Sequence, residues 1–412
     1  MKSRPRYVLA GTGSRGIEMF GQAIVGPYSG NAELVGLCDI NPLRMSVAQR
    51  RLGIELPAFT NFDDCLESLK PDSVIVTTPD DTHHKFIIDA MRAGADVITE
   101  KPLTVTFDHC QAILQAERET GRKCTVAFNY RHAPFHTRIK ELLKSDCIGK
   151  VISIDFHYYL DTQHGADYYR RWHRKKEHSG GLLVHKATHH FDLISWWLEQ
   201  EPISVFARGD RQYYGSTREE HGVRCCDCSH AHKCEFHFDL SAKPWMAELY
   251  AAAESADHYY RDRCVFDPEI NIEDNLQVLI GYSGGTNLGY SLASFLPFEG
   301  FTIAFNGAKG RLEAEEIWGE GLGQSEENPF DRYGLTLYPL RGKKEKIPVP
   351  MVLGGHAGGD IRLQKMLFEE VAPDPMGHRA NALAGAMSVL AGIAANESIA
   401  TGETVSVPRL SL

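Results

Sequence analysis

The sequence has little positive charge for its size, since 44 lysine and arginine residues face 54 aspartate and glutamate residues and the formal net charge is -10. A protein that neutralises nucleic-acid phosphates needs a clustered excess of lysine and arginine, so we expect no nucleic-acid partner. Long apolar runs are also missing, because none reaches the roughly 18 residues of a membrane span. The basic start at residues 1–6 continues without the apolar region of a signal peptide. We therefore expect a cytoplasmic protein without a membrane partner.

Internal repeats are absent too, which leaves globular domains as the unit of organisation. A chain of 412 residues exceeds one ordinary core and predicts two domains. Hydrophobic residues at 43% and charged residues at 24% are typical of a soluble globular protein.

The first motif is a glycine-rich turn between a strand and a helix. Apolar residues 7–10 lead into the sequence G-T-G-S-R-G at residues 11–16, and a helical pattern follows. In the pattern G-x-G-x-x-G the glycines allow a tight turn and let backbone N–H groups approach a pyrophosphate. The next apolar run ends at Asp39, where an acid binds ribose hydroxyls and disfavours a 2′-phosphate. The predicted cofactor is NAD in preference to NADP, although Arg44 could soften this choice.

Strands and helices alternate as far as residue 127, which is the pattern of a doubly wound parallel sheet. One strand ends in Thr78-Pro79, and the strand at residues 97–99 ends in Glu100-Lys101-Pro102. Ligands of such sheets bind outside the carboxyl ends of the strands, so Lys101 should point its ammonium into the crevice. Taken alone, the tripeptide is more readily interpreted as a surface Glu-Lys pair beside a loop proline.

Together these motifs resemble the Gfo/Idh/MocA family, named after glucose-fructose oxidoreductase, inositol dehydrogenase and rhizopine catabolism. Ala93-Gly94, Asn129-Tyr130-Arg131 and a histidine- and aspartate-containing stretch after Gly180-Gly181 extend the resemblance along nearly the whole chain. It implies an α/β Rossmann domain at residues 1–127 and an α+β domain at residues 128–412 that binds substrate and forms oligomers. This second domain should contain a large, open-faced, mostly antiparallel sheet. The implied cofactor contacts are Gly11, Gly13, Ser14, Arg15, Gly16, Asp39, Thr78, Pro79, His83, Glu100, Lys101 and Asn129.

Residues 182–198 have the length and apolar content of a helix and resemble the family pattern D-x-G-x-H-x-x-D. His189 and Asp192 fit this pattern, whereas His185 replaces the first aspartate. Imidazole titrates near neutral pH, so His189 suits the acceptance of a hydroxyl proton while cationic Lys101 stabilises the developing alkoxide. These two roles could be exchanged. The alternatives are a core histidine satisfied by Asp192, or a two-histidine metal half-site without an evident third ligand.

Basic and aromatic residues mix over residues 164–174, which we expect to form a loop. Such side chains suit a polyol, whose hydroxyls need hydrogen bonds and whose C–H faces stack on rings, although a solvated loop explains them equally well. We assign Arg131, Arg171, Trp172 and His185 to the substrate pocket. The predicted function is hydride transfer between nicotinamide and a secondary hydroxyl or keto group of a sugar, sugar derivative or cyclitol. The alternatives are a redox-neutral glycoside-cleaving enzyme that recycles bound NAD, and a catalytically silent nucleotide-binding regulator.

The ten cysteines should be thiols in a cytoplasmic protein, yet some of them have the spacing of a metal site. A C-x2-C-x5-C stretch with a later cysteine supplies four ligands, as a closed tetrahedral zinc site requires. We therefore predict one structural zinc ion in an insertion of about residues 222–266, with free thiols as the alternative. Cys226 could replace Cys225, and His230 or His232 could replace one thiolate. The predicted ligands are Cys225, Cys228, Cys234 and Cys264.

The remaining chain alternates apolar runs with glycine turns over residues 275–315, as an antiparallel sheet does. One face of such a sheet must be covered, so we expect a homodimer or homotetramer. The alanine-rich residues 380–396 should form a helix that packs back near the first domain. A late glycine-rich segment could close the pocket through His356 or Asp360, and the acidic residues 319–328 are expected to form a loop.

Overall fold

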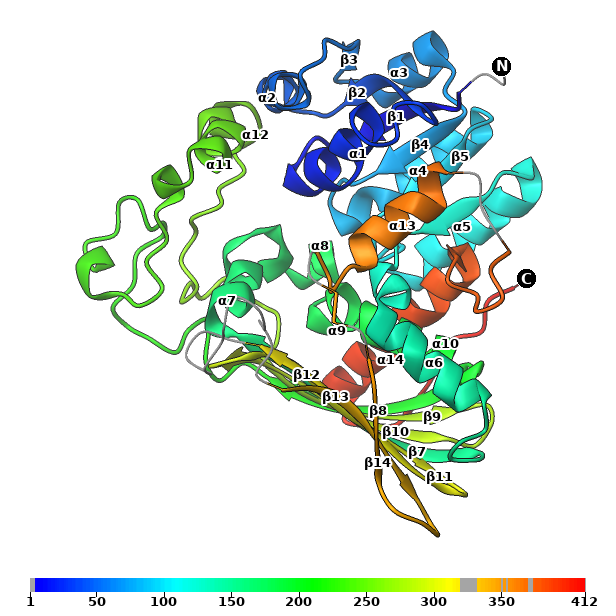
Figure 1. Cartoon of the computed structure of the whole chain (residues 1–412). Helices are drawn as coiled ribbons and strands as arrows, with labels where there is room; N and C mark the ends of the chain where they lie inside the picture. The colour runs from blue at the N-terminus through cyan, green and yellow to red at the C-terminus, as the bar shows by residue number, and fades with distance from the viewer. Residues whose placement is uncertain (1–3, 319–331, 350, 353–354, 370–372, 412) are drawn as a thin grey trace.

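The computed structural model of the chain contains two sheets, which lie one above the other in Figure 1 with helices between them. The first sheet is almost entirely parallel and the second almost entirely antiparallel, so the predicted fold class is confirmed. The loop expected over residues 319–328 lies outside the described part of the chain. The structure describes residues 4–318, 332–349, 351–352, 355–369 and 373–411.

The first sheet is built from short strands that are buried on both faces. Continuous apolar runs such as Val74-Ile75-Val76 suit this position, because helices cover both sides of the sheet. Val74 packs into a core on one face, and Ile75 packs into a separate core on the other. Across the sheet the strands are β15 (Ala380–Asn381), β6 (Cys124–Val126), β5 (Asp96–Thr99), β4 (Ser73–Val76), β1 (Arg6–Ala10), β2 (Glu33–Cys38) and β3 (Ala58–Phe59). The helical segments between them are η1 (Gly16–Gly21), α1 (Gln22–Val25), α2 (Pro42–Leu52), α3 (Phe62–Leu69), η2 (Asp80–Thr82), α4 (His83–Arg92) and α5 (Phe107–Thr120).

The strand order places β1 next to β4, and the strand ends diverge at this point to leave a crevice. Gly11, which follows β1, has a φ of +91°, and a Cβ at this position would lie 2.7 Å from the Thr77 backbone. A side chain would therefore separate the loops that follow β1 and β4. The glycine brings the two loops to the same edge of the sheet, where the predicted cofactor residues lie.

The second sheet has one buried face and one open face. In β9, Leu276, Val278 and Ile280 are buried, whereas Gln277 and Leu279 between them are exposed, as the two-residue period of a strand requires. Only the pair β7 and β10 is parallel among the described strands. Across the sheet the strands are β14 (Glu345–Ile347), β13 (Arg332–Pro339), β12 (Gly310–Trp318), β11 (Glu299–Gly307), β7 (Val151–Asp161), β10 (Asn287–Leu296), β9 (Asn275–Tyr282), β8 (Pro202–Asp210) and β16 (Val405–Ser406).

Two predictions about the helical part of the second domain, at residues 164–174 and 182–198, were wrong. Residues 164–174 are mostly helical instead of a loop, because the Asp161 side chain caps the first turn by accepting the Gln163 and His164 N–H groups. The helix expected over residues 182–198 is interrupted, since the Ala187 N–H donates to the Leu182 carbonyl, five residues back. The described helical segments from residue 129 onward are η3 (Asn129–His132), α6 (Pro134–Lys144), α7 (Thr162–Arg170), η4 (Trp172–Arg174), α8 (Lys176–Ser179), α9 (Leu182–His185), α10 (Thr188–Leu198), η5 (Ala231–Lys233), η6 (Leu240–Ala242), α11 (Pro244–Leu249), η7 (Ala251–Ala253), α12 (Glu254–Asp257), α13 (Gly359–Phe368) and α14 (Ala382–Thr401).

Helix α14 lies between the two sheets and contacts both parts of the chain (Figure 1). It packs on α5 and β6 on one side and on β8 and α10 on the other. Small residues allow this approach, because a Cβ at Gly385 would lie 2.8 Å from Val126, and one at Gly392 would lie 2.4 Å from the Leu183 carbonyl. By length and composition α14 could also cross a membrane, but 61% of its most apolar window is buried inside the protein, as in a core helix.

The 222–266 insertion extends from the second sheet to the first domain (Figure 1). There α11 and η7 contact α2. The Asn41 side chain donates to the Ala253 carbonyl at 2.9 Å, and Arg50 forms an ion pair with Glu248. The insertion therefore lies against the edge of the first sheet at which the glycine-rich turn begins.

Candidate active site

The glycine-rich turn after β1 has the shape of a phosphate cradle. A Cβ at Gly16 would lie 2.4 Å from the Gly11 carbonyl oxygen, so no larger residue fits this turn. The Ser14 N–H points outward and donates to the Tyr250 hydroxyl at 2.9 Å. This hydroxyl oxygen stands where a phosphate oxygen would accept from the same N–H. The turn therefore fits a dinucleotide. In this structure the Tyr250 hydroxyl of the insertion accepts the Ser14 N–H instead.

Asp39 lies at the end of β2 and faces the same turn. Its Oδ2 accepts the Thr12 N–H at 2.7 Å and the Thr12 hydroxyl at 2.9 Å. Its Oδ1 accepts from Arg44 at 3.2 Å, and Arg44 also pairs with Asp257 of the insertion at 2.5 Å. Because two carboxylates hold its guanidinium, Arg44 is not free to meet a 2′-phosphate.

A second polar cluster joins the turn to the predicted strand-end residues. Arg15 pairs with Glu100 at 2.5 Å and with Asp360 at 3.3 Å. The Asn129 side-chain amide donates to Asp360 at 2.7 Å, whereas Asn129 Oδ1 is buried without a hydrogen-bond partner among the described residues. His356 also meets Asp360, at 2.9 Å. The unpartnered Asn129 oxygen provides a place for a cofactor group that donates a hydrogen bond.

His83 holds two loops together instead of pointing into the crevice. It is 1% exposed, and its ring nitrogens lie 2.9 Å from the carbonyl oxygens of Thr78 and Pro102. Those carbonyls belong to the loops after β4 and β5, which Thr78-Pro79 and Glu100-Lys101 occupy. His83 thus positions the predicted cofactor loops, and a direct contact between its ring and the cofactor stays a prediction.

Lys101 lies at the centre of the site. Its Nζ donates to the His185 carbonyl at 3.0 Å and lies 3.4 Å from His185 Nε2. On the other side of the ring, His185 Nδ1 lies 2.5 Å from the buried Asp80 carboxylate. Burial lowers the pKa of Lys101, while the Asp80 charge opposes that shift. The sequence indicated Lys101 and His185, but it gave no reason to select Asp80 within Thr78-Pro79-Asp80-Asp81.

His189 is buried against an aromatic ring and retains an open nitrogen. Its ring stacks on Tyr130 with centroids 4.3 Å apart, and its Nδ1 is buried without a partner among the described residues. Burial, and then the charge of Lys101, lower its pKa well below the usual value, so the ring is neutral at physiological pH. Asp192 does not satisfy this ring, because Arg131 binds both of its oxygens, at 2.7 and 2.5 Å. The His189 nitrogen is therefore available to a substrate hydroxyl.

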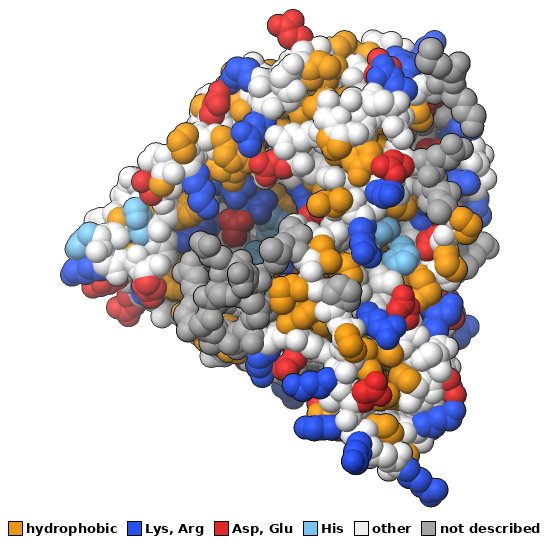
Figure 2. Space-filling view, in the orientation of Figure 1, with side chains coloured by type: hydrophobic (Ala, Val, Ile, Leu, Met, Phe, Trp, Pro, Cys, Tyr) orange, Lys and Arg blue, Asp and Glu red, His pale blue; other side chains and the backbone are white. Residues whose placement is uncertain are grey.

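The predicted substrate residues divide into two groups. The buried guanidinium of Arg131 pairs with Asp192 and donates to the Gly377 carbonyl. Because these groups occupy the guanidinium, the structure does not support a contact between Arg131 and the substrate. Trp172 lies near the site, because its ring meets His185 edge-on at 5.8 Å. Arg171 donates to Asp167 at 2.9 Å and to Tyr259 at 3.2 Å. Figure 2 shows a hollow in the surface whose walls carry basic, acidic and histidine side chains.

Lys186 is an ionisable residue of this region that the sequence reasoning missed. Its side chain is 4% exposed, and its Nζ lies 4.8 Å from the centre of the Tyr158 ring. Burial lowers its pKa to about 8. A lysine inside the apolar run that contains His185 was the available signal, because an ammonium is rarely placed in a core without a function.

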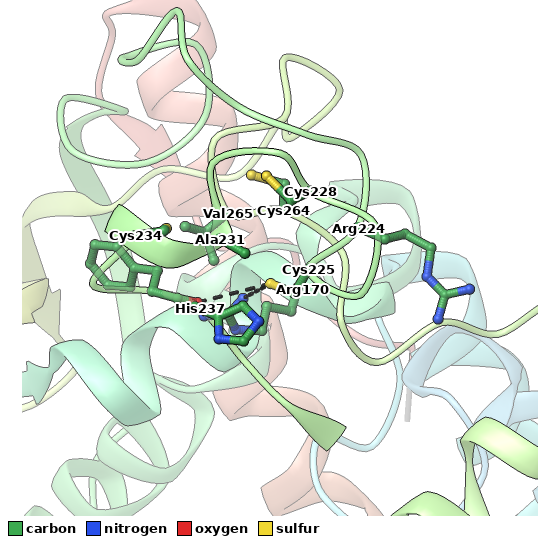
Figure 3. Close-up of a pocket in the computed structure, with 10 residues that line it drawn as sticks. Arg170, Arg224, Cys225, Cys228, Ala231, Cys234, His237, Cys264 and Val265 are labelled. Carbon is green, nitrogen blue, oxygen red and sulfur yellow. Dashed lines mark hydrogen bonds between the residues drawn. The ribbon is translucent and has the colours of Figure 1, made fainter. Parts of the chain in front are cut away.

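The insertion cysteines line a common pocket, shown in Figure 3. Cys225 Sγ accepts from Arg170 at 3.4 Å, and Cys264 Sγ accepts the Phe266 N–H at 3.4 Å. Burial raises the pKa of both thiols, which opposes the thiolate form that zinc binds. The pocket contains all four predicted ligands, Cys225, Cys228, Cys234 and Cys264.

These contacts do not support the predicted zinc ion. Within the described residues, no group of three or more histidine, cysteine, aspartate or glutamate side chains is placed to hold a metal ion. The ten cysteines are free thiols. The spacing in the sequence thus indicated four residues that share one pocket, but the sulfur atoms of Cys225 and Cys264 hydrogen-bond to different neighbours.

Two family models match most of the chain. One, described as an oxidoreductase family with an NAD-binding Rossmann fold, matches residues 6–128. The other, the C-terminal alpha/beta domain of the same oxidoreductase family, matches residues 140–407. The chain belongs to the Gfo/Idh/MocA family. Its first domain is the NAD-binding Rossmann domain of this oxidoreductase family.

Relatives of this Gfo/Idh/MocA enzyme include YteT of Bacillus subtilis (strain 168), named as an oxidoreductase. YteT is 37% identical over 430 residues, which cover 98% of each chain. The scyllo-inositol 2-dehydrogenase (NAD(+)) of the same strain is 30% identical over 183 residues, or 42% of this chain and 49% of its own. Inositol 2-dehydrogenase of Rubrobacter xylanophilus is 27% identical over 184 residues, or 43% and 48% of the two chains.

Solved structures share the fold of this Gfo/Idh/MocA enzyme over almost its full length. An oxidoreductase domain protein from Kribbella flavida has a TM-score of 0.71 at 18% identity, covering 99% of this chain and 100% of its own. The WlbA dehydrogenase from Bordetella pertussis, solved with NADH and UDP-GlcNAcA, has a TM-score of 0.67 at 18% identity and the same coverage. At these identities the likeness shows the fold.

Proposed function

We propose that the protein oxidises a secondary hydroxyl of a sugar, sugar derivative or cyclitol, or reduces the corresponding ketone, with NAD as the hydride carrier. The observation that supports this most is the placement of Lys101 beside a buried histidine site. His189 offers an unpartnered nitrogen, and Lys101 lies at the strand edge that also carries the glycine-rich turn. The names of the inositol dehydrogenase relatives support a polyol substrate.

The chemistry at this site divides between the two residues. When bound, NAD accepts the hydride that leaves the carbinol carbon. The ammonium of Lys101 can bond the substrate oxygen and favour its alkoxide, and neutral His189 can share or accept the hydroxyl proton. Trp172 and Tyr168 place flat rings near His185, where the C–H faces of a sugar can stack.

This function is tested by incubating the protein with NAD and a panel of free sugars and cyclitols while nicotinamide absorbance is followed. We expect stoichiometric NADH from at least one of them. Lys101→Ala and His189→Ala should each lower kcat by about 100- to 10,000-fold while NAD still binds, because each removes a group at the reacting oxygen. Lys85→Ala, on the exposed face of α4, is the matched control and should be fully active.

A second candidate function is a redox-neutral, glycoside-cleaving enzyme with resident NAD. Contacts of the insertion favour it, since Tyr250 meets the glycine-rich turn and Asp257 meets Arg44, so that the insertion covers the nucleotide edge. The same assay with chromogenic glycosides separates the two functions. Release of the aglycone without net NADH supports this candidate, and neither signal across the panel supports a nucleotide-binding regulator.

We further propose that NAD binds more tightly than NADP. Asp39 is buried at the turn, and Arg44 is neutralised by Asp39 and Asp257, so a 2′-phosphate would meet a carboxylate without a free cation. Titration of each cofactor should give a lower Kd for NAD. Asp39→Ser should shift the ratio toward NADP by about tenfold or more, equivalent to about 1.4 kcal/mol. Asp63→Ser, at an exposed position, should not change it, and tighter NADP binding by the wild type would contradict the proposal.

We also propose that the enzyme works in the cytoplasm as a homodimer or homotetramer. The negative net charge and free thiols support the first part. The open face of the second sheet supports the second.

A further inference from the structure

A buried carboxylate lies behind the site in a position that the chemistry above does not use. Asp80 follows the loop after β4 and is 3% exposed. Its Oδ2 lies 2.5 Å from His185 Nδ1. A carboxylate without such a partner would be costly to bury, so this contact accounts for its presence inside the protein.

The three side chains form a chain of hydrogen bonds with a defined direction. A lysine ammonium has only donors, so the His185 nitrogen that it meets must act as an acceptor. The proton of neutral His185 is then on Nδ1, from which it is donated to Asp80. The order is therefore carboxylate, imidazole and ammonium, and the ammonium of Lys101 is the end that faces the site.

We propose that Asp80 and His185 are positioning residues that hold Lys101 and take a proton from it, which makes Lys101 the base of the reaction. This inference rests on the proposed function and deepens it, because it settles which of Lys101 and His189 receives the hydroxyl proton. Asp80 also accounts for the altered helix motif. The family pattern has an aspartate where this chain has His185, and here Asp80 of the first domain supplies a carboxylate instead.

The proton balance is simple. One N–H bond of the Lys101 ammonium breaks and an N–H bond forms at His185 Nε2, which gives an imidazolium that the Asp80 carboxylate stabilises. The neutral amine then accepts the hydroxyl proton as the hydride leaves for NAD. His189 keeps a hydrogen bond to the same oxygen. Reduction of the ketone runs through the same steps in reverse.

Other ionisable groups face the pair, and apart from Asp81, which the control variant changes, they are the same in every variant compared below. Their charges set the absolute pKa of Lys101 and His185, so the test uses differences between variants. These groups are Asp81, Glu100, Arg15, Arg171, His173, Lys186 and Tyr168.

The kinetic test compares Asp80→Asn with the wild type across pH. In the variant the imidazolium loses its counter-charge, so Lys101 must release its proton to solvent. We expect kcat to fall at least tenfold with KM little changed, because Lys101 is no longer held in place. We also expect the acid limb of the kcat profile to move to lower pH, because the charge that raises the pKa of Lys101 is lost. His185→Gln should show the same loss of kcat, because its amide cannot accept a proton from Lys101. Asp81→Asn is the matched control, since this neighbouring carboxylate meets His178 instead.

A second measurement needs no substrate and separates this inference from the proposed function. Competitive acetylation with mass spectrometry gives the pKa of Lys101 in the NAD-bound protein. Asp80→Asn should lower this pKa relative to the wild type, because the charge that raises it is lost. An unchanged pKa, or a kcat loss with the wild-type pH profile, would overturn the inference even in an active enzyme. A lowered pKa in a protein that oxidises no sugar would leave the pair standing and reject the function.

Discussion

Glu316 is a single buried carboxyl group that should make the stability of this enzyme depend on pH. It is 4% exposed on β12, and burial raises its pKa from 4.5 to about 8. The nearby His136 Nε2 is 3.8 Å away, and burial lowers the pKa of that imidazole to about 4. Between these values both groups are neutral, so the contact is not an ion pair over the physiological range.

The sign of the effect follows from the raised pKa. The unfolded chain releases the Glu316 proton near pH 4.5, but the folded chain keeps it until about pH 8. This contribution to stability is therefore complete below pH 4.5 and is lost as the pH rises toward and through 8.

We expect Glu316→Gln to remove this loss and to raise the free energy of unfolding at pH 9 by on the order of a few kcal/mol relative to the wild type. Urea unfolding at pH 5, 7 and 9 measures it. Glu313→Gln on the same strand, with a side chain that is 42% exposed, is the control and should leave the pH dependence as it is. Equal pH dependence in Glu316→Gln and the wild type would contradict the assignment.

At the scale of elements, the contact between the insertion and the glycine-rich turn has a kinetic consequence. The Tyr250 hydroxyl accepts the Ser14 N–H that a pyrophosphate would use, so Tyr250 must give up this bond when the cofactor binds. Such a hydrogen bond contributes about 0.5–1.5 kcal/mol.

Tyr250→Phe should therefore bind NAD with an association rate about 2- to 10-fold higher than that of the wild type. Stopped-flow quenching of protein fluorescence provides the rate. Tyr260→Phe tests the specificity, because this ring of the same insertion packs on Arg224 and Arg263 through its face. A slower or unchanged rate in Tyr250→Phe would mean that the hydroxyl is not in the way of the cofactor.

Elements with a local signal could be predicted from the sequence. The glycine-rich turn after β1 and the ends of β4 and β5 follow from residues that are adjacent in the chain, and these loops do meet at one sheet edge. The helix at residues 162–170 was missed because its signal is one capping side chain, Asp161, before a run that composition alone assigns to a loop.

Contacts between distant segments could not be predicted. Asp80 and His185 are 105 residues apart, and neither neighbouring sequence indicates the other. The same holds for Tyr250 and Ser14, which are 236 residues apart. A spacing rule grouped the four cysteines correctly, but it does not specify side-chain directions, which depend on packing around Arg170 and Phe266.

For the whole molecule, the open face of the second sheet predicts self-association. Leu279 on β9 is 60% exposed there and lies opposite Phe206 of β8. This apolar pair lies toward the β16 end of the open sheet face, where it can form part of an isologous interface.

We expect Leu279→Arg to shift the protein toward the monomer, because a charge buried within such an interface is left without water. Light scattering after gel filtration measures the mass. Leu340→Arg, at a position that is 73% exposed in the turn after β13, should keep the wild-type mass. A wild-type protein that is monomeric at micromolar concentration would contradict the prediction.

The position of β15 bears on how the chain is made. This strand pairs with β6 at the edge of the first sheet, yet it is translated only after the whole second sheet apart from β16. During synthesis the first domain therefore exposes an unpaired strand edge and the apolar surface that α14 later covers. An unpaired strand edge of this kind can pair with other chains and cause aggregation. Expression of residues 1–127 alone should consequently give aggregates, and the yield of the full chain should respond to chaperones that hold nascent polypeptides.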